Sequence, residues 1–160
     1  MDKTVLLAFI ARAHRHTYAA PDEIGNMHLC KVPVLQGHTD HEYSEGDLKY
    51  HDSYAGTIWA PGREVVFYRG EPIWCMAYQG QHNSAYDDVF FQEQAFPFLK
   101  RALMSFDDNI PFRGPTEFCE DDFKYAFEMK GDYDYFKGQE TLFYKGDRVF
   151  SQDIMGSLIK

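Results

Sequence analysis

Long apolar runs, paired cysteines and an excess of positive charge are all missing from this sequence. An apolar stretch at residues 5–13 is too short for a membrane span and is interrupted by Arg12, and no signal-peptide pattern precedes it. The three cysteines, Cys30, Cys75 and Cys119, lack CxxC spacing, which argues against a disulfide framework and against a zinc knuckle. We therefore expect a cytoplasmic protein that does not insert into a membrane.

Basic residues are too few for a nucleic-acid-binding surface. Lys and Arg together number 16, against 25 Asp and Glu, and the formal net charge is −9. Because affinity for nucleic acid comes largely from Lys and Arg side chains that neutralise phosphates, we expect no direct nucleic-acid binding. An acidic mimic of nucleic acid is an alternative that this charge allows.

Recognisable catalytic motifs are absent as well. The sequence has no GxSxG, no P-loop GK[ST], no GxGxxG after a strand and no HExxH. Residues 38–41 (HTDH) and His51 are of the types that bind metals, but their spacing fits no metal-binding pattern. We therefore predict no cofactor, no metal and no catalytic residue, and a small enzyme acting through Asp52, Glu64 or a loop histidine is an alternative.

Aromatic rings are abundant, with 11 Tyr, 14 Phe and 2 Trp in 160 residues. A chain of this length forms one domain that can bury most of its apolar surface without disulfides or metal. Rings of this number predict that the core, and any pocket, is built largely from aromatic side chains, many with a polar atom.

The sequence also repeats itself. Residues 42–56 align with residues 117–131, and residues 63–80 align with residues 139–156, with shared glycines and with Glu64 matched to Glu140. The repeat predicts an internal duplication within a single domain over residues 1–160. The first copy covers about residues 2–80 and the second about residues 87–156.

Each copy is predicted to contain one helix followed by three strands. Apolar residues recur at helical spacing in residues 2–18 and 87–106, where Pro97 predicts a kinked helix or a helix that opens there. Strands are predicted at residues 46–56, 63–70 and 72–80 and at the matching positions of the second copy, and residues 19–40 are predicted to be a long loop and candidate lid. The predicted fold class is α+β, with an antiparallel sheet, two helices on one face and a pseudo-two-fold axis.

Asp52 is the first candidate for a ligand site. It stands where the second copy has Phe127, on the strand face that carries Tyr50 and Tyr54, because side chains alternate along a strand. A buried carboxylate must be paired, hydrogen-bonded or protonated, and the candidate partners are Tyr50, Tyr54, His51 and a loop histidine. The alternative is that Asp52 lies near a strand end and is solvated.

Glu64 and Glu140 form the second candidate. Each begins the second strand of its copy, so a pseudo-two-fold axis would bring the two carboxylates face to face. Paired acids suit a cationic or amine-bearing ligand that stacks against aromatic rings, whereas hydrogen bonds to the local turns are the structural alternative. The predicted ligand-binding set is Glu64, Glu140, Tyr50, Asp52, Tyr68, Tyr144 and Trp59.

These residues predict a non-catalytic small-molecule-binding domain of the sensor or effector type. Both faces of the predicted third strands carry apolar residues, however, and helices cover only one face of a sheet. The other face would then meet another layer, a ligand or a second chain. A protein-interaction or homodimerisation module is therefore an alternative function.

Four strings of the sequence carry a resemblance to a known family. They are EGDLKYHDSYAG, GREVVFYRGEPIWCMAYQG, PFRGP at residues 111–115 and GDYDYFKGQETLFYKGDRVF. The chain resembles an uncharacterised bacterial domain family, some members of which carry the domain after a repressor-type helix-turn-helix. The resemblance implies a sensor or effector domain paired with a DNA reader, although no helix-turn-helix precedes Asp2 in this sequence.

Overall fold

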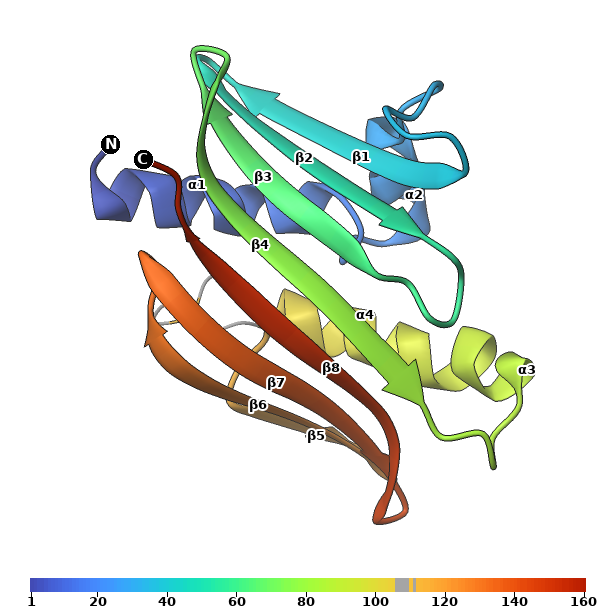
Figure 1. Ribbon diagram of the computed structural model, residues 1–160. Helices are drawn as coiled ribbons and strands as arrows, with labels where there is room; N and C mark the ends of the chain where they lie inside the picture. The colour runs from blue at the N-terminus through green and yellow to red at the C-terminus, as the bar shows by residue number, and fades with distance from the viewer. Residues whose placement is uncertain (106–109, 111) are drawn as a thin grey trace.

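One antiparallel sheet of eight strands forms the body of the protein in the computed structural model, which describes residues 1–105, 110 and 112–160 (Figure 1). The strand order is β1-β2-β3-β4-β8-β7-β6-β5, and every neighbouring pair is antiparallel. The strands are β1 (His38–Glu45), β2 (Leu48–Ala55), β3 (Gly62–Tyr68), β4 (Glu71–His82), β5 (Glu117–Glu120), β6 (Phe123–Asp132), β7 (Tyr135–Tyr144) and β8 (Asp147–Leu158). The predicted α+β class with an antiparallel sheet is confirmed.

Each half of the sheet has four strands, so the prediction of three was wrong. The additional strands are β1 and β5, which form the two edges of the sheet. β1 is mostly polar and β5 has only four residues, and polar or short strands are typical of sheet edges because they discourage pairing with other chains. Neither strand has a run of alternating apolar residues, which is why the periodicity of the sequence did not reveal them.

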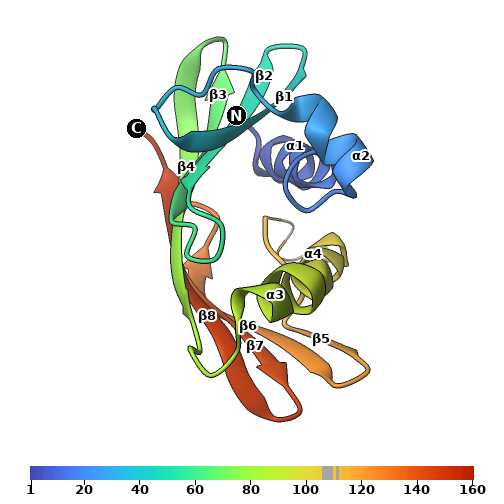
Figure 2. The same ribbon diagram turned by 90° about the vertical axis from the view of Figure 1, so that its right-hand side faces the viewer.

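Two longer helical segments lie on one face of the sheet (Figure 2). The first, α1 (Lys3–His16), begins after Asp2, whose side chain accepts hydrogen bonds from the backbone N–H groups of Thr4 and Val5. The second runs through α3 (Asp88–Phe90), the π-helical turn η2 (Phe91–Ala95) and α4 (Phe96–Met104). The irregular turn lies directly before Pro97, which sits in the first turn of α4, where a missing N–H is tolerated. The predicted break near Pro97 is thus an irregular turn within a continuous helical path.

The predicted long loop contains short helical turns of its own. These are α2 (Asp22–Gly25) and η1 (Asn26–His28), and the chain then leads into β1. The backbone N–H of Val34 donates to Asp40 Oδ2 at 2.8 Å, which ties this segment to the outer face of the sheet. Residues 29–34 are therefore attached to β1, also through the bond from Cys30 N–H to the Asp40 carbonyl and the bridge between Leu29 and His41.

The core lies between the helices and the inner face of the sheet. α1 contacts β1 and β2, and α4 contacts β6. Fully buried side chains come from both helices and from the central strands and include Phe9, Ile10, Phe91, Phe98, Trp74, Met76, Tyr125 and Phe136. Burial of each of these side chains contributes about 1.5–3 kcal/mol to the stability of the fold. Apolar burial therefore holds the helices against the inner face of the sheet.

The register of the central β4–β8 ladder is symmetric with respect to the sequence repeat. Tyr78 pairs with Ile154, which is its own aligned counterpart in the second copy. A shift of register follows Val66 in β3, and the same irregularity follows the aligned residue Leu142 in β7. From each edge to the centre of the sheet, the four strands of a half follow one another in chain order, β1 to β4 from one edge and β5 to β8 from the other.

Candidate functional site

A cavity of about 940 Å³ lies between the inner face of the sheet, the end of α1 and α4. Its wall includes residues 17–22, part of β2, the loop at residues 56–60 and one face of α4. Asp52 from the first half and Gln152 from the second half both line it. Its volume is within the range of about 300–1,000 Å³ that is usual for small-molecule sites.

Glu64 lies in the wall of this cavity on β3. Its side chain is buried, with 3% of the residue exposed. His14 Nε2, at the end of α1, lies 2.8 Å from Glu64 Oε2, and Arg113 Nη1 lies 3.7 Å from Glu64 Oε1. The partners of Glu64 are therefore side chains from distant segments, and the alternative of hydrogen bonds to a local turn was wrong.

Glu140 on β7 is fully buried beside the same arginine. Arg113 makes a bidentate contact with it, from Nε to Oε1 at 2.8 Å and from Nη2 to Oε2 at 2.6 Å. Tyr125 donates to Oε1 at 2.6 Å, and Gln152 donates to Oε2 at 2.9 Å. Arg113 thus lies between the two glutamates that the sequence repeat equates.

These contacts stabilise the positively charged form of Arg113. Burial alone lowers the pKa of the Arg113 guanidinium, but the charge of Glu140 and its hydrogen bonds outweigh that effect, and the pKa is raised overall. Bidentate pairing of this kind is the strongest form of charge-assisted hydrogen bonding. Arg113 and Glu140 therefore act as a fixed ion pair beneath the cavity.

Asp52 on β2 pairs directly with Glu64 across the β2–β3 ladder. Only 2% of the residue is exposed, so the alternative of a solvated strand end was wrong. Tyr78 donates to Asp52 Oδ1 at 2.7 Å, whereas Tyr50, Tyr54 and His51 had been the expected partners. Burial, followed by the charge of Glu64, raises the pKa of Asp52 to about 8. Asp52 is therefore mostly protonated at neutral pH.

The structure brings together some of the predicted ligand-binding residues and leaves others apart. Tyr50 lines the cavity with Asp52 and Glu64, and Glu140 lies beneath it. Three of the predicted aromatic residues, Trp59, Tyr68 and Tyr144, do not line the cavity. Trp59 is exposed and donates to His82 Nδ1, Tyr68 lies beside Arg69, and Tyr144 packs against Phe90 and Phe123.

Sequence reasoning missed four residues of the site, His14, Tyr78, Arg113 and Gln152. Arg113 belongs to the string PFRGP, which has no counterpart in the first copy, so comparison of the copies could not reveal it. The signal that could have found it was charge balance, because two buried carboxylates require a cation. Gln152 stands where the first copy has Met76, and this exchange of an apolar residue for a polar one was a second signal.

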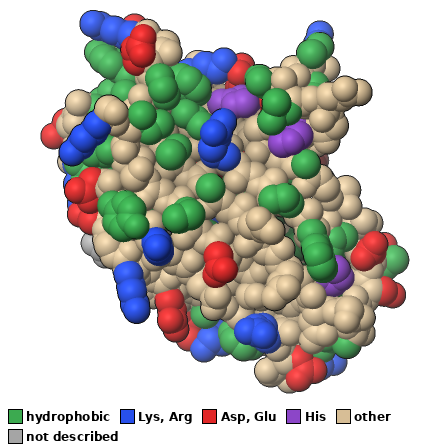
Figure 3. Space-filling model, viewed as in Figure 1, with side chains coloured by type: hydrophobic (Ala, Val, Ile, Leu, Met, Phe, Trp, Pro, Cys, Tyr) green, Lys and Arg blue, Asp and Glu red, His purple; other side chains and the backbone are tan. Residues whose placement is uncertain are grey.

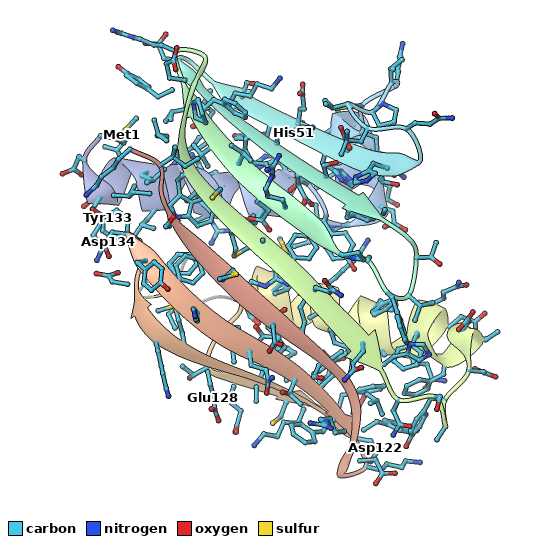
Figure 4. The ribbon with its side chains drawn as sticks, viewed as in Figure 1. Met1, His51, Asp122, Glu128, Tyr133 and Asp134 are labelled. Atoms are coloured by element: carbon cyan, nitrogen blue, oxygen red, sulfur yellow. The ribbon has the colours of Figure 1, made fainter. Side chains whose placement is uncertain are left out.

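The outer face of the sheet holds a separate polar network. His51, labelled in Figure 4, contacts Asp40 Oδ2 at 2.9 Å, and Ser53 donates to Asp40 Oδ1 at 2.7 Å. Within residues 1–105, 110 and 112–160, no group of three or more His, Cys, Asp or Glu side chains is placed to hold a metal ion. Figure 3 shows hydrophobic side chains scattered over this face among charged and other atoms, rather than joined into one apolar patch.

Residues 52–159 match the model of a family described as a domain of unknown function, DUF5680. No curated protein matches the chain, and no solved structure matches it. In the described part of the chain, no helix has the length and hydropathy needed to cross a membrane. Asp52, Glu64, Arg113 and Glu140 all fall within the matched region, which covers more than half of the sequence. The chain belongs to the DUF5680 family.

Proposed function

We propose that this protein is a non-catalytic domain that binds a small molecule in the cavity between its helices and its sheet. The observation that carries the proposal is the cavity itself, of about 940 Å³, with the buried Asp52 and Glu64 side by side in its wall. Predominantly apolar cavities with a few convergent polar groups are the usual form of ligand sites. The role is that of a cytoplasmic sensor or effector domain, as the resemblance noted from the sequence implies.

The proposal includes an internal duplication with a pseudo-two-fold axis near Tyr78 and Ile154. The symmetric register of β4 and β8 and the matching irregularities in β3 and β7 support it. Glu64 and Glu140 then occupy equivalent positions on either side of the axis, with Arg113 between them. In this view the first copy has specialised for the ligand, since Asp52 replaces the apolar Phe127 of the second copy.

A thermal-shift screen against metabolites and amines tests the proposal. A cavity ligand at about 100 times its Kd stabilises the folded state by about 2.7 kcal/mol, which raises the Tm by several degrees. Ala60→Trp, which adds an indole at a lining position, is expected to weaken binding of the hit at least tenfold. Ala85→Trp, at an exposed alanine after β4, is the matched control and should leave the affinity unchanged. A screen without hits, or a hit whose affinity Ala60→Trp leaves unchanged, would contradict a ligand site in this cavity.

A second candidate function, an interaction module, is favoured by one observation. The segment from α2 to the start of β1 exposes several apolar side chains, namely Ile24, Met27, Leu29, Val32, Val34 and Leu35. Exposed apolar side chains gathered in one segment are typical of interaction surfaces in soluble proteins. If the surface joins two copies, light scattering gives twice the 18.7 kDa chain mass.

In that case Val32→Lys combined with Val34→Lys restores the monomer, while Val89→Lys, at an exposed apolar residue of α3, does not. A wild-type protein that stays monomeric at high concentration rejects the homodimer.

A further inference from the structure

The acidic cluster at the cavity has more carboxyl groups than cationic groups to balance them. Asp52, Glu64 and Glu140 lie together, and Arg113 supplies one guanidinium for all three. That guanidinium is committed in bidentate fashion to Glu140 and is 3.7 Å from Glu64. The imidazole of His14 contacts Glu64 and does not reach Asp52 in the contacts of the described residues. Among the described residues, Asp52 is therefore the carboxyl group of this cluster that has no cation in direct contact.

One oxygen of Asp52 is also left without a hydrogen bond. Tyr78 donates to Oδ1, and within the described residues nothing donates to Oδ2. Asp52 lines the cavity, and the 2% of the residue that is exposed is the part that a bound group can contact. A buried carboxyl group in this position must either keep a proton or meet a cation.

The rest of the wall suits a cation that carries an apolar body. Four tyrosines line the cavity, and their rings and hydroxyl groups can surround an ammonium group: Tyr18, Tyr50, Tyr54 and Tyr78. Beyond them the wall contains apolar side chains, among them Ile58, Leu99 and Leu103, and two ion pairs, Lys100 with Asp22 and Arg101 with Glu120. An anion would face Asp52 and Glu64, while the guanidinium of Arg113 is committed to Glu140. The lysine and the second arginine of the wall, Lys100 and Arg101, are already in these two ion pairs.

We propose that the ligand of this cavity is an organic ammonium ion with an apolar or aromatic body, and that its charged group replaces the proton of Asp52. The inference rests on the proposed ligand-binding function and assigns the chemical class of the ligand. On binding, the O–H bond of Asp52 breaks, the proton passes to solvent, and the carboxylate pairs with the ammonium group. Glu64 remains beside it, so the cation meets two carboxylates.

Other titratable groups around Asp52 bear on how binding depends on pH. Glu64 on β3, Tyr78 on β4 and Arg113 face it, and Asp40 on β1 acts on it from the other side of the sheet. His14 on α1 faces Glu64. Affinity for the ammonium ion should therefore rise with pH up to about 8, where Asp52 loses its proton without assistance.

Three probes with similar skeletons and different charges test the assignment, namely 2-phenylethylammonium, 2-phenylethanol and 3-phenylpropanoate. Isothermal titration calorimetry at pH 7 in phosphate and in Tris reports both the affinity and the number of protons released. We expect the ammonium probe to bind at least tenfold more tightly than the other two, with release of nearly one proton. Asp52→Asn should remove both the preference and the proton release. Glu45→Gln, at a partly exposed glutamate that pairs with Arg12 outside the cavity wall, is the control and should change the affinity less than threefold.

Each contrary outcome has its own meaning. Equal or tighter binding of the alcohol or the carboxylate rejects the ammonium assignment while ligand binding in the cavity stands. Ammonium binding without proton release rejects the exchange at Asp52, and failure of all three probes to bind rejects the assignment as well. The proposed function is judged separately, by the metabolite screen and by Ala60→Trp. Circular dichroism of Asp52→Asn establishes that its loss of binding does not come from unfolding.

Discussion

Replacing Arg113 by Met is expected to lower the free energy of unfolding by about 3–5 kcal/mol, which is the cost of breaking a buried ion pair by removing one partner. The substitution leaves Glu140 fully buried without a cation and removes the positive charge that also faces Glu64. Methionine keeps the apolar stem of the side chain but lacks the guanidinium group, so the packing of the stem is retained. Urea unfolding monitored by circular dichroism measures the change.

Arg12→Met is the matched control for this prediction. Arg12 also makes a bidentate contact with a glutamate, Glu45, but the pair lies at the surface. Exposed pairs contribute about 0–1 kcal/mol, so this variant should remain close to wild type. Adding Glu140→Gln to Arg113→Met should recover part of the loss, because the uncompensated charge is gone. A loss below 1 kcal/mol for Arg113→Met, or no recovery in the double variant, would show that the buried charges are not coupled as the distances indicate.

Asp52→Asn is expected to change the dependence of stability on pH. In the folded protein the pKa of Asp52 is about 8, whereas the ordinary value for an aspartate is 3.8. The folded state therefore holds this proton more tightly, and the stability that it contributes is fully present below about pH 4 and is lost as the pH rises to about 8. Asn cannot ionise, so the variant should escape this loss and exceed wild type by several kcal/mol at pH 9.

The measurement for Asp52 is a series of unfolding curves between pH 4.5 and 9. The difference between variant and wild type isolates Asp52, because the other titrating groups are common to both proteins. Asp153→Asn, at an exposed aspartate of β8 that accepts a hydrogen bond from Gln139, is the control and should run parallel to wild type. Parallel curves for Asp52→Asn itself would mean that Asp52 is ionised in the folded protein at neutral pH.

Most of the regular structure followed from local patterns. The helix of residues 3–16 and the strands around residues 48–55, 62–68 and 71–82 were predicted, because helical spacing, alternation and glycine turns are properties of neighbouring residues. The edge strands β1 and β5 were not predicted, since their stability comes from pairing with β2 and β6 and not from their own hydrophobicity. Pairing of this kind depends on tertiary context.

The candidate site was predicted only in part, for the same reason. Comparison of the two copies singled out Asp52, Glu64 and Glu140, which the structure brings into one cluster. It could not supply Arg113, which comes from a segment that occurs once and meets the cluster only after folding. Trp59, Tyr68 and Tyr144 were predicted as ligand contacts only because they are aromatic. The order of residues along the chain does not show which aromatic side chain faces the cavity.

The continuous ladder between β4 and β8 limits how this domain can respond to a bound molecule. Residues 74–82 of β4 pair with β8 and so join the two halves of the sheet. A hinge motion that separates the halves would therefore break the backbone hydrogen bonds of this central ladder. If the domain senses the ligand proposed above, the change on binding must be transmitted by the parts that rest on the sheet, which are the end of α1, the turns at residues 19–28 and α4. The surface of these parts is where we then expect a downstream protein to detect the ligand-bound state.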